Sequence, residues 1–426
     1  MSSYNKSFRT ILAWCLYDWA AASFSIIVTT FVFATYFTAK IAENNIVGTF
    51  QWANGMSLAG IIIALTSPIF GAIADHAGFH KRWLFVFTLI CMISSALLWF
   101  AYPDTSFIYF TLACVVIGTI GFEIALVFYN AYLPYIATTN YLGRISGIGW
   151  GFGYFGGIVA LLVALLLFVK GNHPWLDHQT AAQIRICGPF VTVWFFIFSI
   201  PLFLSRDQIE TPTQPLPQAV KAGIKELMIT LKKLPSEKNM LLYLFSHMIY
   251  TDGLNTLFAF GGIYAAGTFG LSFEEILMLG ITMNVAAGIG AVLLAWMDDL
   301  LGSKETVMVS LISLTIFGIP VLFVHDKYLF WTLAALLCVF VGPVQSASRS
   351  LMVRLILTKD TSTEMFGLYA LSGRITAFIG PWILGMATLY FNSQRVGMAT
   401  ILVFFALGAL TLIPVHVEKS EDKISA

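Results

Sequence analysis

Four charged side chains stand inside long apolar stretches of this chain: Asp18, Glu123, Asp252 and Arg374. A charge in the hydrocarbon of a membrane costs several kcal/mol, so each of them calls for a partner or a function. A carboxyl group held away from water can take up a proton or bind a cation. The forked guanidinium of arginine suits a carboxylate. We therefore expect these side chains to bind a small charged solute, to exchange a coupling ion, or to pair with one another.

Polar side chains accompany these charges at helical spacing. Tyr17 and Asp18 lie on a face of small and polar residues that would suit a cavity wall, and Asn130 lies about two helical turns after Glu123. The candidate residues for binding the substrate or the coupling ion are Tyr17, Asp18, Glu123, Asn130, Asp252, Asn255, Gln345 and Arg374.

Structural roles are the alternative for these residues. Asp18 could make a packing hydrogen bond to a neighbouring backbone, and Glu123 could be the structural partner of an arginine such as Arg374. For His247 the favoured account is an interior histidine with satisfied hydrogen bonds. Arg349 lies nearer the end of its apolar stretch, which favours a structural or gating role.

No pattern in the sequence indicates an enzyme, a metal site or a nucleotide-driven pump. The seven histidines make no H-E-x-x-H set, and the five cysteines make no CxxC pair. The sequence has no G-x-x-x-x-G-K-[ST] phosphate-binding loop. The net charge of +1 points to no nucleic-acid partner. We therefore expect no catalytic residues, no metal and no cofactor.

The composition indicates that membrane-spanning helices position the candidate residues. The 426 residues are 58% hydrophobic and 11% charged, with a mean hydropathy of +0.83, whereas soluble proteins carry about 25% charged residues. A spanning helix needs about 20 mostly apolar residues. Twelve predicted spans meet this requirement: 11–38, 50–74, 83–101, 106–135, 145–169, 187–204, 239–266, 273–297, 305–324, 328–353, 365–391 and 395–415.

Basic residues predict how these spans are oriented. Sixteen of the 23 Lys and Arg residues fall in segments on the side of the N-terminus, and five fall on the opposite side. Because basic residues gather in the cytoplasm, both termini are predicted to be cytoplasmic. The predicted parts are an N-terminal six-helix half (1–204), a cytoplasmic linker (205–238), a C-terminal six-helix half (239–415) and a tail (416–426). The later part of the linker could form an amphipathic helix on the inner membrane face.

The two predicted halves carry matching motifs. The loop after the second span reads GAIADHAGFHKRW and the loop after the eighth reads AWMDDLLGSKETV, and each has Asp-x-x-Gly followed by Lys. The matching pairs are Asp75 and Asp299, Gly156 and Gly380, and Asp18 and Asp252, at offsets of 224, 224 and 234 residues. Parallel repeats of this kind predict a substrate site near the midplane of the membrane, between the halves.

Several motifs resemble one branch of a known transporter superfamily. GAIADHAGFHKRW resembles the signature between the second and third spans of the major facilitator superfamily, although His76 stands where an arginine is usual. WCLYDWAAASF, FYNAYLP, RISGIGWGFGYFGG, VQSASRS and FGLYALSG are together similar to its "unknown major facilitator" branch, which is related to the fungal vacuolar effluxers of autophagy. The resemblance implies an all-α fold of twelve transmembrane helices, with two six-helix halves related by pseudo-two-fold symmetry.

The resemblance also implies a cytoplasmic gate and a mode of action. The expected gate residues are Asp75, Gly78, Lys81, Arg82, Arg144 and Asp299. We expect a secondary active transporter that moves a small organic solute by alternating access. An amino acid or similar zwitterion is favoured because acids and Arg374 are found together in the spans, and the buried acids favour coupling to protons.

Other functions stay open on the sequence alone. The carrier could be coupled to sodium instead, or could move a sugar, a cationic metabolite or a metal chelate. A non-transporting receptor built on a carrier fold is the alternative from a different class. We expect a monomer in the lipid bilayer of a bacterial inner membrane, with an organelle membrane as the alternative.

Overall fold

The computed structural model describes residues 2–78, 80–169, 176–205, 215–271, 273–356 and 361–417. All regular secondary structure in these ranges is helical, as predicted. Residues 206–214 of the predicted linker and 418–426 of the predicted tail lie outside the described residues.

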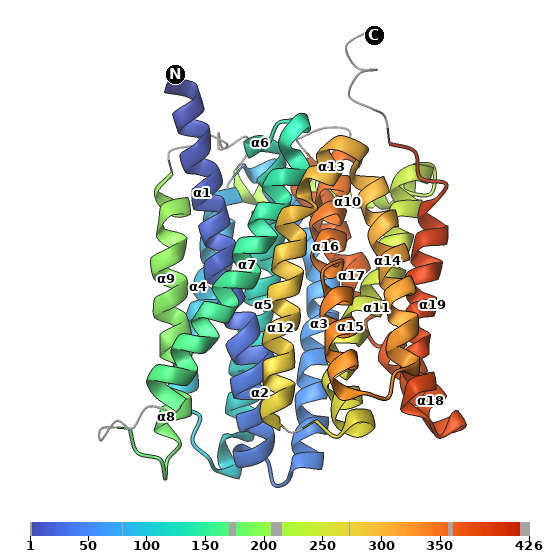
Figure 1. The fold of residues 1–426 in the computed structure, drawn as a ribbon. Coiled ribbons are helices and arrows are strands. Elements are labelled where there is room, and N and C mark those ends of the chain that lie inside the picture. The colour runs from blue at the N-terminus through green and yellow to red at the C-terminus, as the bar shows by residue number, and fades with distance from the viewer. Residues whose placement is uncertain are drawn as a thin grey trace. The chain divides into compact units, whose positions relative to one another are not determined.

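The chain before the predicted linker folds into consecutive helices (Figure 1), and its short stretches of tighter or wider helix are named η. They are α1 Ser2–Ser23, η1 Phe24–Phe31, α2 Val32–Tyr36, η2 Phe37–Ile41, α3 Asn45–Ala77, α4 His80–Leu97, η3 Leu98–Phe100, η4 Thr105–Phe107, α5 Ile108–Ala131, α6 Leu133–Ile136, η5 Thr139–Tyr141, α7 Leu142–Ala164, η6 Leu165–Val169, α8 Ala182–Arg185 and α9 Cys187–Leu204.

One helix within the predicted linker and nine after it complete the chain. They are α10 Leu216–Lys233, α11 Lys238–Phe269, α12 Phe273–Leu293, α13 Ala295–Leu301, α14 Ser303–Phe323, α15 Lys327–Cys338, α16 Val341–Leu355, α17 Ser362–Arg374, α18 Ile379–Phe391 and α19 Gln394–Leu412.

Eleven helical stretches among the described residues are long and apolar enough to cross a membrane. They coincide with eleven of the twelve predicted spans, because a backbone in lipid must satisfy its hydrogen bonds within its own helix. The remaining predicted span, 239–266, forms α11, whose 32 residues give a length of about 48 Å. Its hydropathy falls below that of the other eleven because it carries polar side chains such as His247 and Asp252.

The chain forms two compact units, and each is described by itself. Unit 1 comprises residues 1–66, 78–129 and 152–213. Within it α9 packs against both α1 and α4. Gly156 of α7 makes a close contact with α1, since a Cβ atom there would lie 2.6 Å from the Cα of Trp19. A small residue is therefore needed where these two helices cross.

Unit 2 comprises residues 67–77, 130–151 and 214–426. Within it α11 packs along α19, and α14 packs against α16 and α19 (Figure 1). Backbones approach closely at two glycines. A Cβ atom on Gly290 would lie 1.8 Å from the carbonyl oxygen of Val339, and one on Gly342 would lie 2.1 Å from that of Ala287.

A glycine stripe explains the motif RISGIGWG at the start of α7. Gly143, Gly147 and Gly151 recur every four residues and contact α12 and α13, where a Cβ atom on any of them would lie 2.4 Å from the nearest atom. This is the small-xxx-small pattern by which membrane helices approach closely. Gly71 of α3 and Gly367 of α17 make a similar contact in the same unit. The ends of α3 and α7 are thereby joined to helices that follow the linker.

Candidate substrate site and gate

Asp18 of α1 lies beside a group of aromatic side chains in unit 1. The Tyr129 hydroxyl donates a hydrogen bond of 3.1 Å to Asp18 Oδ2. The Tyr129 ring stacks on Trp14 with centroids 4.5 Å apart, and Trp14 Nε1 donates to the Tyr129 carbonyl at 3.0 Å. α5 thus contacts α1 through both the backbone carbonyl and the ring of Tyr129. Asp18 is half-buried, so its carboxylate is oriented by Tyr129 without being fully enclosed.

Tyr17, the neighbouring candidate, has a packing role in this structure. It is 1% exposed, and its hydroxyl shares a 2.6 Å hydrogen bond with Thr88 of α4. Its ring stacks on Tyr129 at 5.1 Å. Tyr17 therefore supports the ring that contacts Asp18, and it has little surface to offer a solute.

Glu123 and Asn130, predicted to share a face of one helix, belong to different units. Glu123 is half-buried in α5 within unit 1. Asn130 is near the end of α5, where the chain passes into unit 2. Its Oδ1 accepts a hydrogen bond of 3.2 Å from Arg349 Nη1.

Asp252 of α11 is the most enclosed of the three candidate acids. Asp252 is 1% exposed. Its Oδ2 accepts a 3.0 Å hydrogen bond from the Gly380 amide. Among the described residues Oδ1 has no hydrogen-bond partner. A Cβ atom on Gly380 would lie 2.9 Å from that oxygen and 2.1 Å from Thr256 Oγ1. Glycine at position 380 thus lets the backbone amide reach the carboxylate.

The repeat predicted from sequence recurs in these contacts. Gly380 lies against α11 at Asp252, and its partner in the repeat, Gly156, lies against α1 at Trp19, next to Asp18. In each case a glycine of the predicted fifth span of a half contacts the first span of that half beside its candidate acid. The 224-residue offset therefore marks equivalent helix crossings.

A second polar cluster in unit 2 includes His247, which lies on the same helix as Asp252. His247 Nδ1 and the Ser372 hydroxyl are 2.7 Å apart, and the His247 ring stacks on Tyr369 at 4.0 Å. One turn along α11, the Tyr250 hydroxyl lies 2.7 Å from Ser348 Oγ. His247 is thus a satisfied interior histidine. Short runs of Ser and Tyr inside apolar stretches are the signal that could have found the others.

Of the remaining candidates, Asn255, Gln345 and Arg374 are half-buried in α11, α16 and α17 of unit 2. Their roles in binding stay predictions.

The two repeated aspartates cap helices. Asp75 accepts hydrogen bonds from the amides of Thr363, at 3.2 Å, and Glu364, at 2.8 Å, in the first turn of α17. Asp299 accepts from the amides of Gly143, at 2.7 Å, and Arg144, at 3.2 Å, in the first turn of α7. A carboxylate there satisfies free amides and complements the positive end of the helix dipole.

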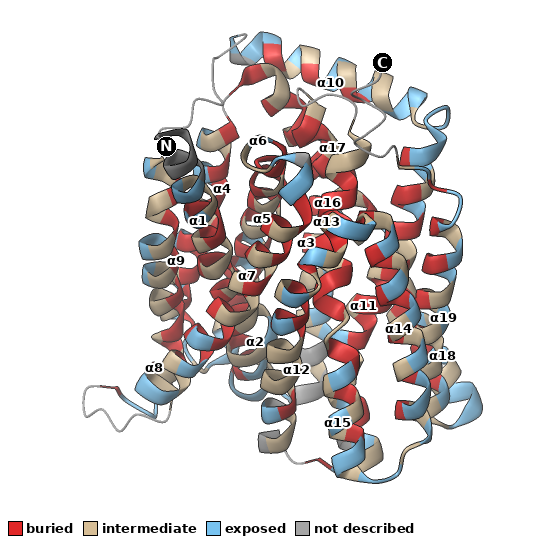
Figure 2. Ribbon diagram, turned by 45° about the horizontal axis from the view of Figure 1, so that its top comes forward, coloured by how far each residue is buried: buried red, intermediate tan, exposed pale blue. Residues whose placement is uncertain are grey.

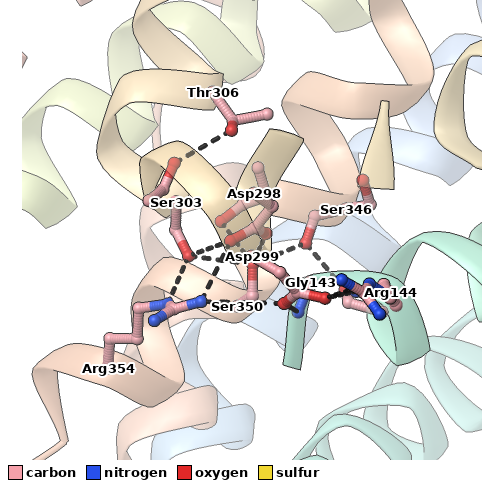
Figure 3. A network of polar contacts seen from close by, with 12 residues as sticks. Gly143, Arg144, Asp298, Asp299, Ser303, Thr306, Ser346, Ser350 and Arg354 are labelled. Carbon is pink, nitrogen blue, oxygen red and sulfur yellow. Dashed lines mark hydrogen bonds and ion pairs between the residues drawn. The ribbon is translucent and has the colours of Figure 1, made fainter. Parts of the chain in front are cut away.

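Asp299 also forms an ion pair with Arg144, another of the expected gate residues. Arg144 Nε lies 3.0 Å from Asp299 Oδ2 (Figure 3), and the Arg144 guanidinium lies over the Trp296 ring at 5.8 Å. The carboxylate therefore holds both the backbone and the side chain at the start of α7.

The residue before it, Asp298, was missed by the sequence analysis and is the centre of a buried cluster. Ser303 Oγ donates to Asp298 Oδ1 at 2.6 Å, Ser350 Oγ donates to Oδ2, and Arg354 Nη2 lies 3.3 Å from Oδ1 (Figure 3). Arg354 Nε also donates to Ser303 Oγ at 2.7 Å. This cluster ties α13 to α14 and α16. The doubled Asp in AWMDDLLG was its only sequence signal.

Arg349 of α16 joins the same end of unit 2. It is 2% exposed, and it donates through Nε to Ser146 Oγ at 3.0 Å and through Nη2 to the Ser146 carbonyl at 2.6 Å. Its guanidinium also lies over the Trp150 ring at 5.6 Å. These contacts fit the structural or gating role expected for Arg349 and attach α16 to α7.

The other predicted gate residues follow Asp75 in the chain. Gly78 ends α3 with a φ of +74°, a conformation that favours glycine. Lys81 of α4 donates to the backbone and hydroxyl oxygens of Ser205 within unit 1, and Arg82 is exposed on the same helix. A shared role of these residues with Asp75 in gating stays a prediction.

The cap at α7 leads to a stability prediction. Replacing Asp299 with alanine should lower the free energy of unfolding by about 1–2 kcal/mol, since it removes the acceptor of two helix amides. Thermal unfolding of the detergent-purified protein measures this effect. Asp104→Ala is the control, because Asp104 caps only the short exposed η4, and equal melting temperatures for the two variants would contradict the prediction.

Comparison with known proteins identifies the family. Residues 53–425 match the model of a family described as vacuole effluxer Atg22-like. The chain is 25% identical to the uncharacterized MFS-type transporter YxiO of Bacillus subtilis, over 96% of this chain and 95% of that protein. It is 22% identical to autophagy-related protein 22 of Yarrowia lipolytica, over 58% of this chain but 46% of that protein.

Solved structures show the same fold at low sequence identity. The proton:xylose symporter XylE superimposes with a TM-score of 0.77 at 13% identity, covering 98% of this chain and 97% of that one. The fucose:proton symporter FucP of E. coli gives a TM-score of 0.75 at 13% identity, covering 96% and 98%. A bacterial homologue of the iron transporter ferroportin gives 0.70 at 14% identity, covering 96% and 98%.

These matches confirm the twelve-helix major facilitator fold that the sequence predicted, and they are to transporters rather than enzymes. The chain is a multi-pass integral membrane protein and belongs to the Atg22-like vacuole effluxer family of major facilitator transporters.

Proposed function

We propose that this transporter moves an amino acid or similar zwitterion by alternating access, driven by protons. The observation that carries the proposal is the Asp252 carboxylate, enclosed in a membrane-spanning helix with one oxygen on the Gly380 amide. Its other oxygen has no partner among the described residues. Such a group is costly as a lone anion in a membrane interior, so a proton or a bound cation would relieve it. Either event can couple an ion to transport.

Asp18 supports the same proposal from the other half of the sequence. It is half-buried and accepts a hydrogen bond from Tyr129, so its carboxylate is oriented without being fully enclosed. A half-buried carboxylate beside aromatic rings suits an ammonium group, because rings and anions both attract cations. Arg374 would suit the carboxylate of a zwitterion. Two similar structures and the family description support a proton-driven carrier. XylE and FucP are proton symporters, and the family is named for an effluxer.

A ligand screen tests the substrate class. Thermal unfolding of the purified protein would be followed with amino acids, dipeptides, sugars and metal chelates, at acidic and at neutral pH. A ligand of the folded state raises the melting temperature by mass action. We expect a rise with amino acids that is lost in Asp18→Asn or Arg374→Ala. A rise with sugars or metal chelates alone would replace the amino-acid proposal with one of those classes.

Substitution of Asp252 tests the coupling. In proteoliposomes with a pH gradient, Asp252→Asn should reduce proton-driven transport about tenfold or more, because the amide cannot take up a proton. Downhill exchange of the same solute should persist. Asp104→Asn is the control, since that carboxylate lies in an exposed turn. Full proton-driven transport by Asp252→Asn would remove this residue from the coupling step.

Two competing proposals concern the coupling step: Glu123 could carry the proton, or sodium could be the coupling ion. If Glu123 carries the proton, Glu123→Gln should uncouple transport in the same assay while Asp252→Asn stays active. If sodium is the coupling ion, transport at fixed pH should require sodium. Absence of transport with every solute class, from a protein that still unfolds cooperatively, would favour a receptor. The inner membrane, the cytoplasmic termini and a monomeric working unit complete the proposal.

A further inference from the structure

The linker helix α10 packs one of its faces on the membrane-spanning part of unit 2. Ala219, Gly223 and Leu227 are buried, and a Cβ atom on Gly223 would lie 2.8 Å from the backbone of Ala72. Thr230 on the same helix is hydrogen bonded to Glu364 at the start of α17. α10 is therefore seated directly on the ends of α3 and α17 (Figure 2).

This contact sets the depth of α10 relative to the bilayer. Ala72 lies five residues before the end of the span Phe50–Ala77, or about 7.5 Å along the helix axis. The 28 residues of that span cover about 42 Å, which matches the bilayer thickness with its headgroup layers, about 40–45 Å. Contact at Ala72 therefore places α10 at the level of the headgroups.

A second apolar stripe of α10 is left uncovered. Ile224, Met228 and Leu231 follow one another at intervals of four and three residues and are 46%, 52% and 40% exposed. At this spacing the three side chains share one face of the helix. That face lies about a third of a turn from the face packed on α3. An exposed apolar stripe on a helix at headgroup depth is typical of an interfacial amphipathic helix.

Lysines flank this stripe. Lys221, Lys225 and Lys232 are exposed, and at 100° per residue they lie along its edge on the side away from α3. The one acid of α10, Glu226, is half-buried and lies on the side of the helix that carries Gly223 and Thr230. The outer edge of the helix therefore carries positive charge next to apolar side chains, which complements anionic lipid headgroups above acyl chains.

We propose that α10 docks on the anionic phospholipid surface of the bilayer that this protein spans. Ile224, Met228 and Leu231 enter the boundary between headgroups and acyl chains, and the three lysines bind lipid phosphates. Because α10 also contacts α3 and α17, lipid binding by α10 then affects the end of unit 2 where Asp75 caps α17. The proposal is independent of the substrate and of the coupling ion.

A nitroxide spin label on α10 of the full-length protein tests this docking. The five native cysteines are buried, so Met228→Cys can be labelled selectively. In nanodiscs of phosphatidylglycerol and phosphatidylethanolamine we expect label 228 to collide several-fold more with oxygen, relative to a water-soluble nickel chelate, than a label at Lys233→Cys. Position 233 is exposed on the other side of the helix. In phosphatidylcholine discs the excess at 228 should fall.

The lysine contribution is tested with Lys221→Gln, Lys225→Gln and Lys232→Gln combined in the Met228→Cys protein. This variant in anionic discs should behave as the parent does in phosphatidylcholine, and Lys233→Gln should have no effect. Equal collision ratios at 228 and 233 in all discs would overturn the proposal. A label at 228 that is shielded from both reagents would overturn it too, and would indicate a protein partner on this face.

Discussion

Replacing Gly290 with alanine is expected to destabilise the protein by about 3 kcal/mol or more, because overpacking a close backbone contact forces the helices apart. The added Cβ atom would lie 1.8 Å from the carbonyl oxygen of Val339. That oxygen belongs to the backbone between α15 and α16, so no side-chain rotation can remove the clash. Thermal unfolding in detergent, together with the yield of monodisperse protein, measures the effect.

Gly261→Ala is the matched control for this prediction. It makes the same chemical change within a helix of the same unit, but no atom lies within 4 Å of the new Cβ position. Alanine favours helix over glycine by up to about 1 kcal/mol. We therefore expect Gly261→Ala to keep or slightly raise the melting temperature. Equal losses in both variants would show that the contact at Gly290 is not close in solution.

Arg354→Ala is expected to destabilise the protein by about 3–5 kcal/mol, because it leaves a buried carboxylate without its cation. The Asp298 side chain is 2% exposed, and Arg354 Nη2 lies 3.3 Å from its Oδ1. Two serines also donate to this carboxylate, but neutral donors do not replace the lost charge. The melting temperature of the detergent-purified variant should fall accordingly.

Two further variants separate the charge effect from simple truncation. Asp298→Asn combined with Arg354→Ala should recover part of the lost stability, because no lone charge remains buried. Lys327→Ala breaks a pair with Glu275 in which both side chains are about a third exposed. Such a pair contributes about 0–1 kcal/mol. If Lys327→Ala and Arg354→Ala cost the same, burial of Asp298 does not govern the energetics of this cluster.

The sequence by itself determined the twelve membrane spans of the fold. A backbone in lipid has no water to bond to, so a long apolar stretch has to be helical whatever surrounds it. The same rule of about 20 mostly apolar residues predicted 239–266, which forms α11, as a span although it carries polar side chains. The repeat was also visible, because Asp75 and Asp299 each follow an apolar stretch with the same local motif.

Only the tertiary structure decided which atoms these residues contact. Asp75 caps a helix 289 positions away at Glu364, and Asp298, rather than the predicted Asp299 alone, is enclosed by Ser303, Ser350 and Arg354. Helical periodicity placed Asn130 with Glu123, whereas in the structure it contacts Arg349.

The physical reason is that these contacts depend on helix crossings. Hydropathy reports how a side chain interacts with lipid or water, and helical spacing reports which residues of one helix share a face. Neither reports which other helix lies opposite. That choice is made where small residues let backbones meet, as at Gly147 against α12 and Gly380 against Asp252. The sequence therefore identified candidate charged residues inside the membrane, and packing determined which atoms they contact.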